Sequence, residues 1–158
     1  MTSSRNTCSD TRSRETKVYV AMKIELKNIL NYQFEVSNLL GKTLRLDAQK
    51  EIGGFEEGFR PMELVLAGVA GCSAFGVVSA LQEMDTEFSN LAINIEGKRQ
   101  SEPPAIFTEI HLHFVLYGKL SKDTFYTTVE DILNNSCSAI AQIENSTDVN
   151  FSCEVKTG

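Results

Sequence analysis

The longest apolar run of the chain constrains its fold more than any other stretch. The run covers residues 61–84 and reads PMELVLAGVAGCSAFGVVSALQEM. It starts with a proline, which suits the first turn of a helix, and it contains no other proline. As one helix it would be roughly 36 Å long with apolar side chains all round, so we expect burial on most of its sides. Glycines and alanines in its middle surround Cys72 and would let another backbone approach closely.

Length, charge and targeting signals narrow the class of protein. A chain of 158 residues predicts one domain, and a net charge of −6 without a basic cluster argues against nucleic-acid partners. The apolar run is interrupted by Glu63 and its hydropathy is lowered by glycines. We therefore interpret it as the core helix of a soluble protein and expect no membrane partner. No secretory signal is visible, which predicts a cytoplasmic protein with reduced thiols.

Apolar periodicity divides the chain into a tail and one domain. Residues 1–17 are rich in Ser, Thr and Arg and predict a flexible tail, which leaves residues 18–158 as an α+β domain. The predicted order is β-β-β-α-β-β-α-α-β, with the first three strands antiparallel. Ser121 is expected to cap the second helix, and the Asn-Asn pair at 134–135 to break it. Ser136 would then cap the last helix, with Cys137 at its first position.

None of the four cysteines belongs to a CxxC or CxxH motif, so no zinc site is predicted. Cys8 lies in the predicted tail and receives no role. Cys72 and Cys153, taken by themselves, are interpreted as small core residues. Cys137 follows Asn-Asn-Ser at a helix start, where free amides and the helix dipole stabilise a thiolate. We expect Cys137 to be partly exposed, and its own context leaves a reactive and a structural role open.

Metal and cofactor chemistry find little support in the remaining motifs. Glu109, His111 and His113 share the polar face of one predicted strand. An HxH pair can chelate a metal, but without a further ligand we expect a solvated face and no metal. The chain has no GxGxxG motif, no P-loop and no nucleophile elbow, so no cofactor is expected.

Three longer motifs resemble a known family. They are PMELVLAGVAGCSAFGVV around Cys72, GKRQSEPPAIFTEIHLHFVLYG in the middle of the chain, and CSAIAQIENSTDVNFSCEV, which begins at Cys137. These motifs resemble the OsmC/Ohr family, and within it the YhfA-type OsmC-like proteins, over Met22 to Val155. The resemblance implies an α+β, OsmC-like fold in which antiparallel sheets wrap around a long central helix. It also implies an intertwined homodimer with the two long helices packed at its centre.

The same resemblance implies a thiol peroxidase that acts in oxidative or osmotic stress defence. Cys72 would be the peroxidatic thiolate, which attacks the O–O bond of an organic hydroperoxide and becomes a sulfenic acid. Cys137 would be the resolving thiol, which condenses with that acid to a disulfide, and a dithiol reductant would restore both thiols. An apolar pocket near Leu66, Val69 and Phe75 would accept the hydroperoxide.

Two departures from the family pattern keep other functions open. The peroxidases carry an N-terminal arginine where this chain reads FEVSN, and the acid expected at Met62 follows one residue later, at Glu63. Glu63 and Cys72 lie on opposite helix faces, roughly 13 Å apart along the axis if the helix is continuous, so Glu63 would act only across a dimer interface or if the helix starts later. Arg99 is the candidate cation. The alternatives are an OsmC-fold binding protein for a small apolar or thiol ligand, and a structural module with both cysteines in its core.

Overall fold

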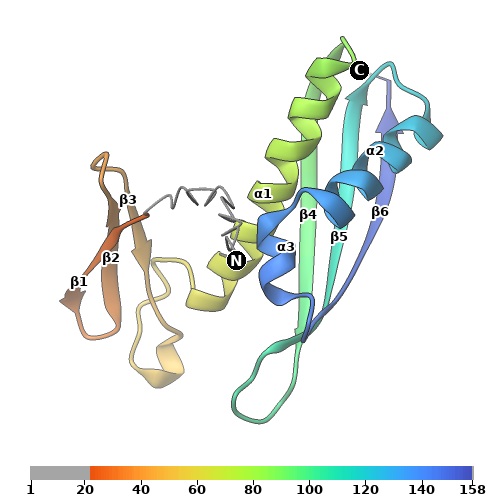
Figure 1. Cartoon of the computed structure of the whole chain (residues 1–158). Coiled ribbons are helices and arrows are strands. Elements are labelled where there is room, and N and C mark those ends of the chain that lie inside the picture. The colour runs from red at the N-terminus through yellow and green to blue at the C-terminus, as the bar shows by residue number, and fades with distance from the viewer. Residues whose placement is uncertain (1–21, 158) are drawn as a thin grey trace, which may run out of the picture.

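The structure, a computed structural model that describes residues 22–157, combines a small sheet with a larger body of strands and helices (Figure 1). The predicted tail, Cys8 and the start of the predicted first strand lie outside the described residues. The element order confirms the predicted α+β class. In chain order the elements are β1 (Ile24–Leu30), β2 (Gln33–Asn38), β3 (Thr43–Leu46), η1 (Lys50–Ile52), α1 (Pro61–Glu83), β4 (Phe88–Arg99), β5 (Phe107–Gly118), α2 (Lys122–Asn135), α3 (Ser138–Ile143) and β6 (Asp148–Lys156).

The apolar run forms α1, as expected, and its first turn is capped. Pro61 occupies the first helical position, where a missing backbone N–H costs nothing. The Glu63 carboxylate accepts a hydrogen bond from the Arg60 amide at 2.9 Å, as in a capping box. α1 therefore begins at Pro61, and the Glu63 carboxylate is hydrogen-bonded at that end of the helix.

α1 buries one stripe of side chains, so the expected burial on most of its sides is wrong for the single chain. The buried residues recur every four positions: Val69, Ser73, Val77 and Leu81. β4, α2 and α3 contact α1, whereas Phe75 is 80% exposed. By length and a mean hydropathy of 2.1 over 18 residues α1 is apolar enough to cross a membrane, a test that core helices of soluble proteins also pass. In the single chain, apolar faces of α1 therefore remain exposed to solvent.

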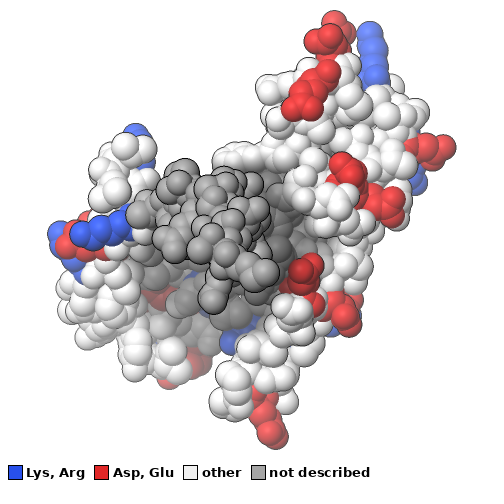
Figure 2. Space-filling view, viewed as in Figure 1, with Lys and Arg blue, Asp and Glu red and all other residues white. Residues whose placement is uncertain are grey.

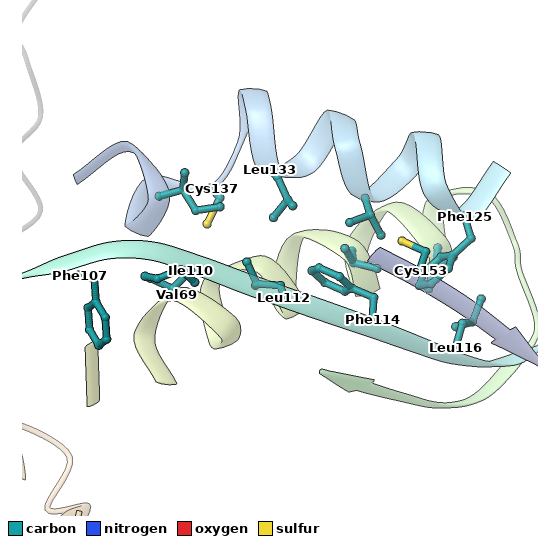
Figure 3. Packing of buried hydrophobic residues seen from close by; sticks show 14 residues of the cluster. Val69, Phe107, Ile110, Leu112, Phe114, Leu116, Phe125, Leu133, Cys137 and Cys153 are labelled. Atoms are coloured by element: carbon teal, nitrogen blue, oxygen red, sulfur yellow. The ribbon is translucent and has the colours of Figure 1, made fainter. Parts of the chain in front are cut away.

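β5 is the central strand of the large sheet and carries much of the core. It pairs antiparallel with β4 and parallel with β6, because the crossover through α2 and α3 returns the chain to the same end of the sheet. Its predicted inward face is confirmed, since Ile110, Leu112, Phe114 and Leu116 are fully buried. These side chains pack between the sheet and the helices, which fixes the position of α1 and α3 (Figure 3).

Two helix boundaries differ from the prediction, while the expected Ser121 cap of α2 is confirmed. α2 continues through Asn134 and Asn135 instead of breaking there. The Asn135 side chain donates a hydrogen bond to Asp131 Oδ1 at 2.8 Å, so this residue fits the last helical turn. Cys137 is consequently the N-cap of α3 and not its first residue.

The small sheet is the predicted antiparallel meander of β1, β2 and β3, and Asp47 ties the following loop to it. The Asp47 carboxylate is buried and accepts hydrogen bonds from the amides of Ala48, Phe55 and Glu57 and from the Gln33 side chain. Burial by itself would raise the pKa of Asp47, but these hydrogen bonds outweigh it and lower the pKa from 3.8 to about 2. The charged form of Asp47 thus organises the chain between the small sheet and α1.

We expect the contribution of charged Asp47 to the stability of the protein to disappear as the pH is lowered. Because the pKa of Asp47 is lower in the folded protein than in the unfolded chain, its stabilisation is present above about pH 4 and is lost as the pH falls toward 2. Urea unfolding of the wild type and of Asp47→Asn at several pH values measures this effect. The variant should be less stable at neutral pH, and the difference should shrink between pH 4 and 2. Glu51→Gln, at an exposed position of the same loop, should leave the pH dependence unchanged.

Candidate active site

Cys72 lies in the middle of α1, at the edge of the buried stripe. It is half-buried and packs against the core cluster, and Cys72, Cys137 and Cys153 are free thiols. The next residue, Ser73, is the polar member of the stripe and is fully buried. Successive helical residues point about 100° apart, so the Cys72 side chain leaves the helix beside the core and not into it.

Cys137 is more deeply buried than its sequence context predicts. Only 5% of the residue is exposed, so the expected partial exposure is wrong. The N-cap position places Cys137 where α3 packs on α1, and Figure 3 shows its sulfur directed into the core, close to Leu133. A cavity of about 180 Å³ reaches this residue from the surface, lined by polar residues of the α2–α3 connection that include Asn135, Ser136 and Ser138.

The structure brings Cys137 to the residue that follows Cys72. The Cys137 sulfur lies 3.4 Å from Ser73 Oγ, and this oxygen also lies 2.8 Å from the Val69 carbonyl oxygen, to which it donates. No role was predicted for Ser73 from the sequence. Its only signal was a serine at the four-residue spacing of Val69 and Val77. Direct pairing of Cys72 with Cys137 stays a prediction.

Glu63 and Arg99 gather at the beginning of α1 instead of beside Cys72. Glu63 caps the helix nine residues before Cys72, which amounts to roughly 13 Å along the axis. Arg99, at the end of β4, donates from Nε to the Ala105 carbonyl at 2.6 Å. Arg99 and Arg60 together line a cavity of about 460 Å³ next to Pro61. The remaining wall of this cavity is largely apolar and comes from Leu26, Tyr32, Phe34, Leu46, Ala48 and Ile52, with Asp47 and Gln49.

Cys153 is poorly suited to thiolate chemistry. It is buried on β6, which confirms its interpretation as a core residue. Burial raises the pKa of the Cys153 thiol to about 11, and the positive charge of Lys122 offsets only part of that rise.

The histidine pair forms a hydrogen-bonded row on the sheet. His111 Nε2 and His113 Nδ1 both lie within hydrogen-bond distance of Ser152 Oγ, at 2.9 and 2.8 Å. His111 also contacts Asn150, and His113 Nε2 lies 3.7 Å from the Glu154 carboxylate. Over residues 22–157, no three His, Cys, Asp or Glu side chains are grouped so that they could hold a metal ion.

Charged side chains avoid the surface of α1. Between Glu63 and Glu83 the helix has no Asp, Glu, Lys or Arg. On the face shown in Figure 2, acidic side chains are spread over the larger body, some of them next to one another, and several lie at its upper end. Cys72 therefore lies in an apolar stretch of α1, which Cys137 contacts through Ser73, and the nearest charges on α1 are those at its two ends.

Comparisons with known proteins agree with the fold. Residues 54–152 match the family model of OsmC-like protein. Protein YhfA of Escherichia coli strain K12 is 34% identical over 96 residues, which are 60% of this chain and 72% of the relative. These matches confirm the resemblance drawn from the sequence motifs.

Solved structures show the same fold. A hypothetical protein from Aquifex aeolicus superposes with a TM-score of 0.78 at 27% identity, covering 89% of this chain and 99% of the other. An organic hydroperoxide resistance protein OsmC from Legionella pneumophila superposes with a TM-score of 0.70 at 20% identity, covering 88% and 100%. At this identity the Legionella structure supports the fold alone. With the long helix, the two sheets and the matched region in agreement, the chain belongs to the OsmC-like protein family.

Proposed function

We propose that the protein is a thiol-dependent peroxidase that reduces organic hydroperoxides through Cys72 and Cys137. The observation that carries the proposal is the position of the Cys137 sulfur, which is buried and 3.4 Å from the residue next to Cys72. Membership of the OsmC-like family supports it, because the Legionella structure is named as an organic hydroperoxide resistance protein. We further propose that the protein acts in the cytoplasm in stress defence.

The proposed cycle has three steps. The Cys72 thiolate attacks one oxygen of the hydroperoxide, the O–O bond breaks, and the alcohol leaves with a proton while Cys72 becomes a sulfenic acid. The Cys137 thiol then displaces that oxygen as water and forms a disulfide with Cys72. An external dithiol reduces the disulfide by thiol–disulfide exchange and is itself oxidised. The half-buried position of Cys72 beside apolar side chains suits an organic hydroperoxide.

We propose that the active form is a homodimer in which two α1 helices pack against each other. A Cβ added at Gly68 or Gly71 would meet no atom within 4 Å in the single chain, although each glycine costs about 1 kcal/mol of helix stability relative to alanine. A second copy packed at this point explains both glycines, together with the exposure of Phe75. Lipid would cover the same faces without needing a close backbone approach.

The dimer would also supply the charges that Cys72 lacks in its own chain. Cys72 lies four residues after Gly68, and Leu64 lies four residues before it. An antiparallel crossing at Gly68 would therefore place the first turn of the second α1 alongside Cys72. That turn contains Glu63 and is preceded by Arg60, whose side chain lines the 460 Å³ cavity with Arg99. A nearby cation favours the thiolate form of a cysteine.

The cavity beside Pro61 favours a second candidate function, the binding of a small ligand. Its volume of about 460 Å³ and its apolar wall suit a small organic molecule, and Arg60 and Arg99 suit an acidic group on it. In that case the protein would hold its ligand without turning over peroxide.

Mass spectrometry of the protein treated with an organic hydroperoxide separates the two candidates. A peroxidase is expected to yield a disulfide between the peptides of Cys72 and Cys137, which a dithiol then removes. Cumene hydroperoxide is a suitable probe, with hydrogen peroxide for comparison. Full-length protein that stays reduced at both cysteines with every peroxide would contradict the peroxidase proposal and leave ligand binding as the function to pursue.

A further inference from the structure

We propose that Ser73 is a positioning residue for Cys137 in the second step of the cycle, so this inference rests on the proposed peroxidase function. Ser73 follows Cys72 directly in α1 and is the polar residue in an otherwise apolar buried stripe. Its side chain is completely buried. Two groups contact its hydroxyl: the Val69 carbonyl oxygen at 2.8 Å and the Cys137 sulfur at 3.4 Å.

The position of the Ser73 hydroxyl hydrogen decides which group is the donor in the contact between Ser73 and Cys137. A serine hydroxyl has a single hydrogen and can accept through two lone pairs. With the hydrogen donated to the Val69 carbonyl, the contact with Cys137 is made by the thiol, whose S–H points at Ser73 Oγ. In the reduced protein Ser73 therefore holds the Cys137 sulfur against α1, one residue away from Cys72.

The Ser73 hydroxyl can also donate a hydrogen bond to Cys137 when Cys137 is a thiolate. Rotation about its Cβ–Oγ bond turns the hydrogen from the Val69 carbonyl to the sulfur without moving a heavier atom. The Val69 carbonyl keeps a partner, because it also accepts the backbone N–H four residues later in the helix. Cys137 belongs to the same apolar core cluster as Leu133 and Ile140, where a thiolate without a donor would be costly. Ser73 supplies that donor.

Cys137 reacts in the chemical step, and Ser73 does not. The Cys137 sulfur attacks the sulfur of the Cys72 sulfenic acid, so the S–S bond forms while the S–O bond of Cys72 and the S–H bond of Cys137 break. The departing hydroxide takes up the proton released by Cys137 and leaves as water. Ser73 makes no covalent bond in this step. It determines where the sulfur starts and stabilises it as its proton leaves.

Separate measurement of the two steps tests the inference. In Ser73→Ala, trapping with dimedone should show sulfenic acid forming on Cys72 at the wild-type rate. Conversion to the disulfide should be slower by about tenfold, since a hydrogen bond to a charged group is lost. Ser73→Thr, which keeps the hydroxyl, should recover most of the rate. Thr127→Ala, which also removes a hydroxyl that donates to a helix carbonyl but lies at an exposed position of α2, should behave as the wild type.

Ser73→Ala is expected to fold, because alanine is the best helix former and the change leaves no buried polar atom of α1 without a partner. Circular dichroism and thermal unfolding of each variant check this directly. If Ser73→Ala forms both the sulfenic acid and the disulfide at the wild-type rates, Ser73 does not position Cys137, while the peroxidase function still stands. Failure of the wild type to form sulfenic acid on Cys72 would overturn the peroxidase function, and the inference with it.

Discussion

Cys72→Ser is expected to abolish reduction of organic hydroperoxides, with a fall of about a thousandfold or more, as is usual when a catalytic nucleophile is removed. A serine hydroxyl stays protonated at neutral pH and cannot take an oxygen atom to form a sulfenic acid. The change is nearly isosteric, and the half-buried site tolerates it, so folding should be unaffected. The measurement is peroxide consumption in the presence of dithiothreitol, with free alcohol as the product.

Cys137→Ser should separate the two halves of the reaction. The first step needs only Cys72, so one equivalent of hydroperoxide should still be consumed and the sulfenic acid should accumulate. Without a resolving thiol, turnover then depends on direct attack by dithiothreitol on Cys72. Mass spectrometry should find the sulfenic acid or its dimedone adduct at Cys72 and no disulfide.

Cys153→Ser is the matched control for these variants. Cys153 is buried on β6, and its raised pKa keeps it a thiol at neutral pH, so its loss should leave peroxide consumption unchanged. Comparison of Cys153→Ser with Cys153→Ala separates a loss of stability from a change in activity. Equal activity of Cys72→Ser and the wild type would contradict the assignment of Cys72 as the nucleophile.

The sequence predicted those parts of the fold that depend on local pattern. The apolar run bounded by Pro61 gave α1, and the alternation along residues 106–117 gave the buried face of β5. The motifs around Cys72 and Cys137 predicted the OsmC-like family, which the family comparison confirms. For the helix and the strand the information lies within a short stretch of chain, where periodicity and capping are sufficient, whereas the family rests on the resemblance of longer motifs.

The features that the sequence did not predict depend on contacts between distant residues. The contact of Ser73 with Cys137 joins positions 64 residues apart, and the burial of Cys137 follows from the packing of α3 on α1. Asp47 lies in a glycine-containing loop and resembles a solvated acid until its hydrogen-bond donors are in place. α1 is apolar on all sides, so its periodicity cannot say which face meets its own chain and which remains open.

A charge placed on the open side of α1 is expected to dissociate the proposed dimer. Phe75→Glu should convert the proposed dimer to monomers, because the side chain is 80% exposed in the single chain and would be buried against the start of the second α1 in the helix pair. An unpaired carboxylate there costs several kcal/mol, since its charge would be removed from water. Sedimentation velocity measures the change, and peroxide consumption should fall with it because in the proposed dimer the second copy would supply the charges near Cys72.

Two glycine variants distinguish a packed helix pair from an open surface. In an isolated chain Gly68→Ala should stabilise α1 by about 1 kcal/mol, because the added Cβ meets nothing within 4 Å. At a close helix crossing the same Cβ would collide with the second backbone and weaken the dimer. Gly76→Ala is the contrasting variant, since its Cβ would lie 2.6 Å from Ile132 Cγ2 of the same chain.

Gly68→Ala should therefore raise the protein concentration at which the dimer dissociates, whereas Gly76→Ala should lower the unfolding free energy by about 1–3 kcal/mol through overpacking within the chain. Urea unfolding at several protein concentrations separates the two effects, because only a loss of association depends on concentration. Gly68→Ala that is more stable than the wild type at every concentration would mean that no second backbone approaches this face. The glycines beside Cys72 would then need an explanation other than a partner helix.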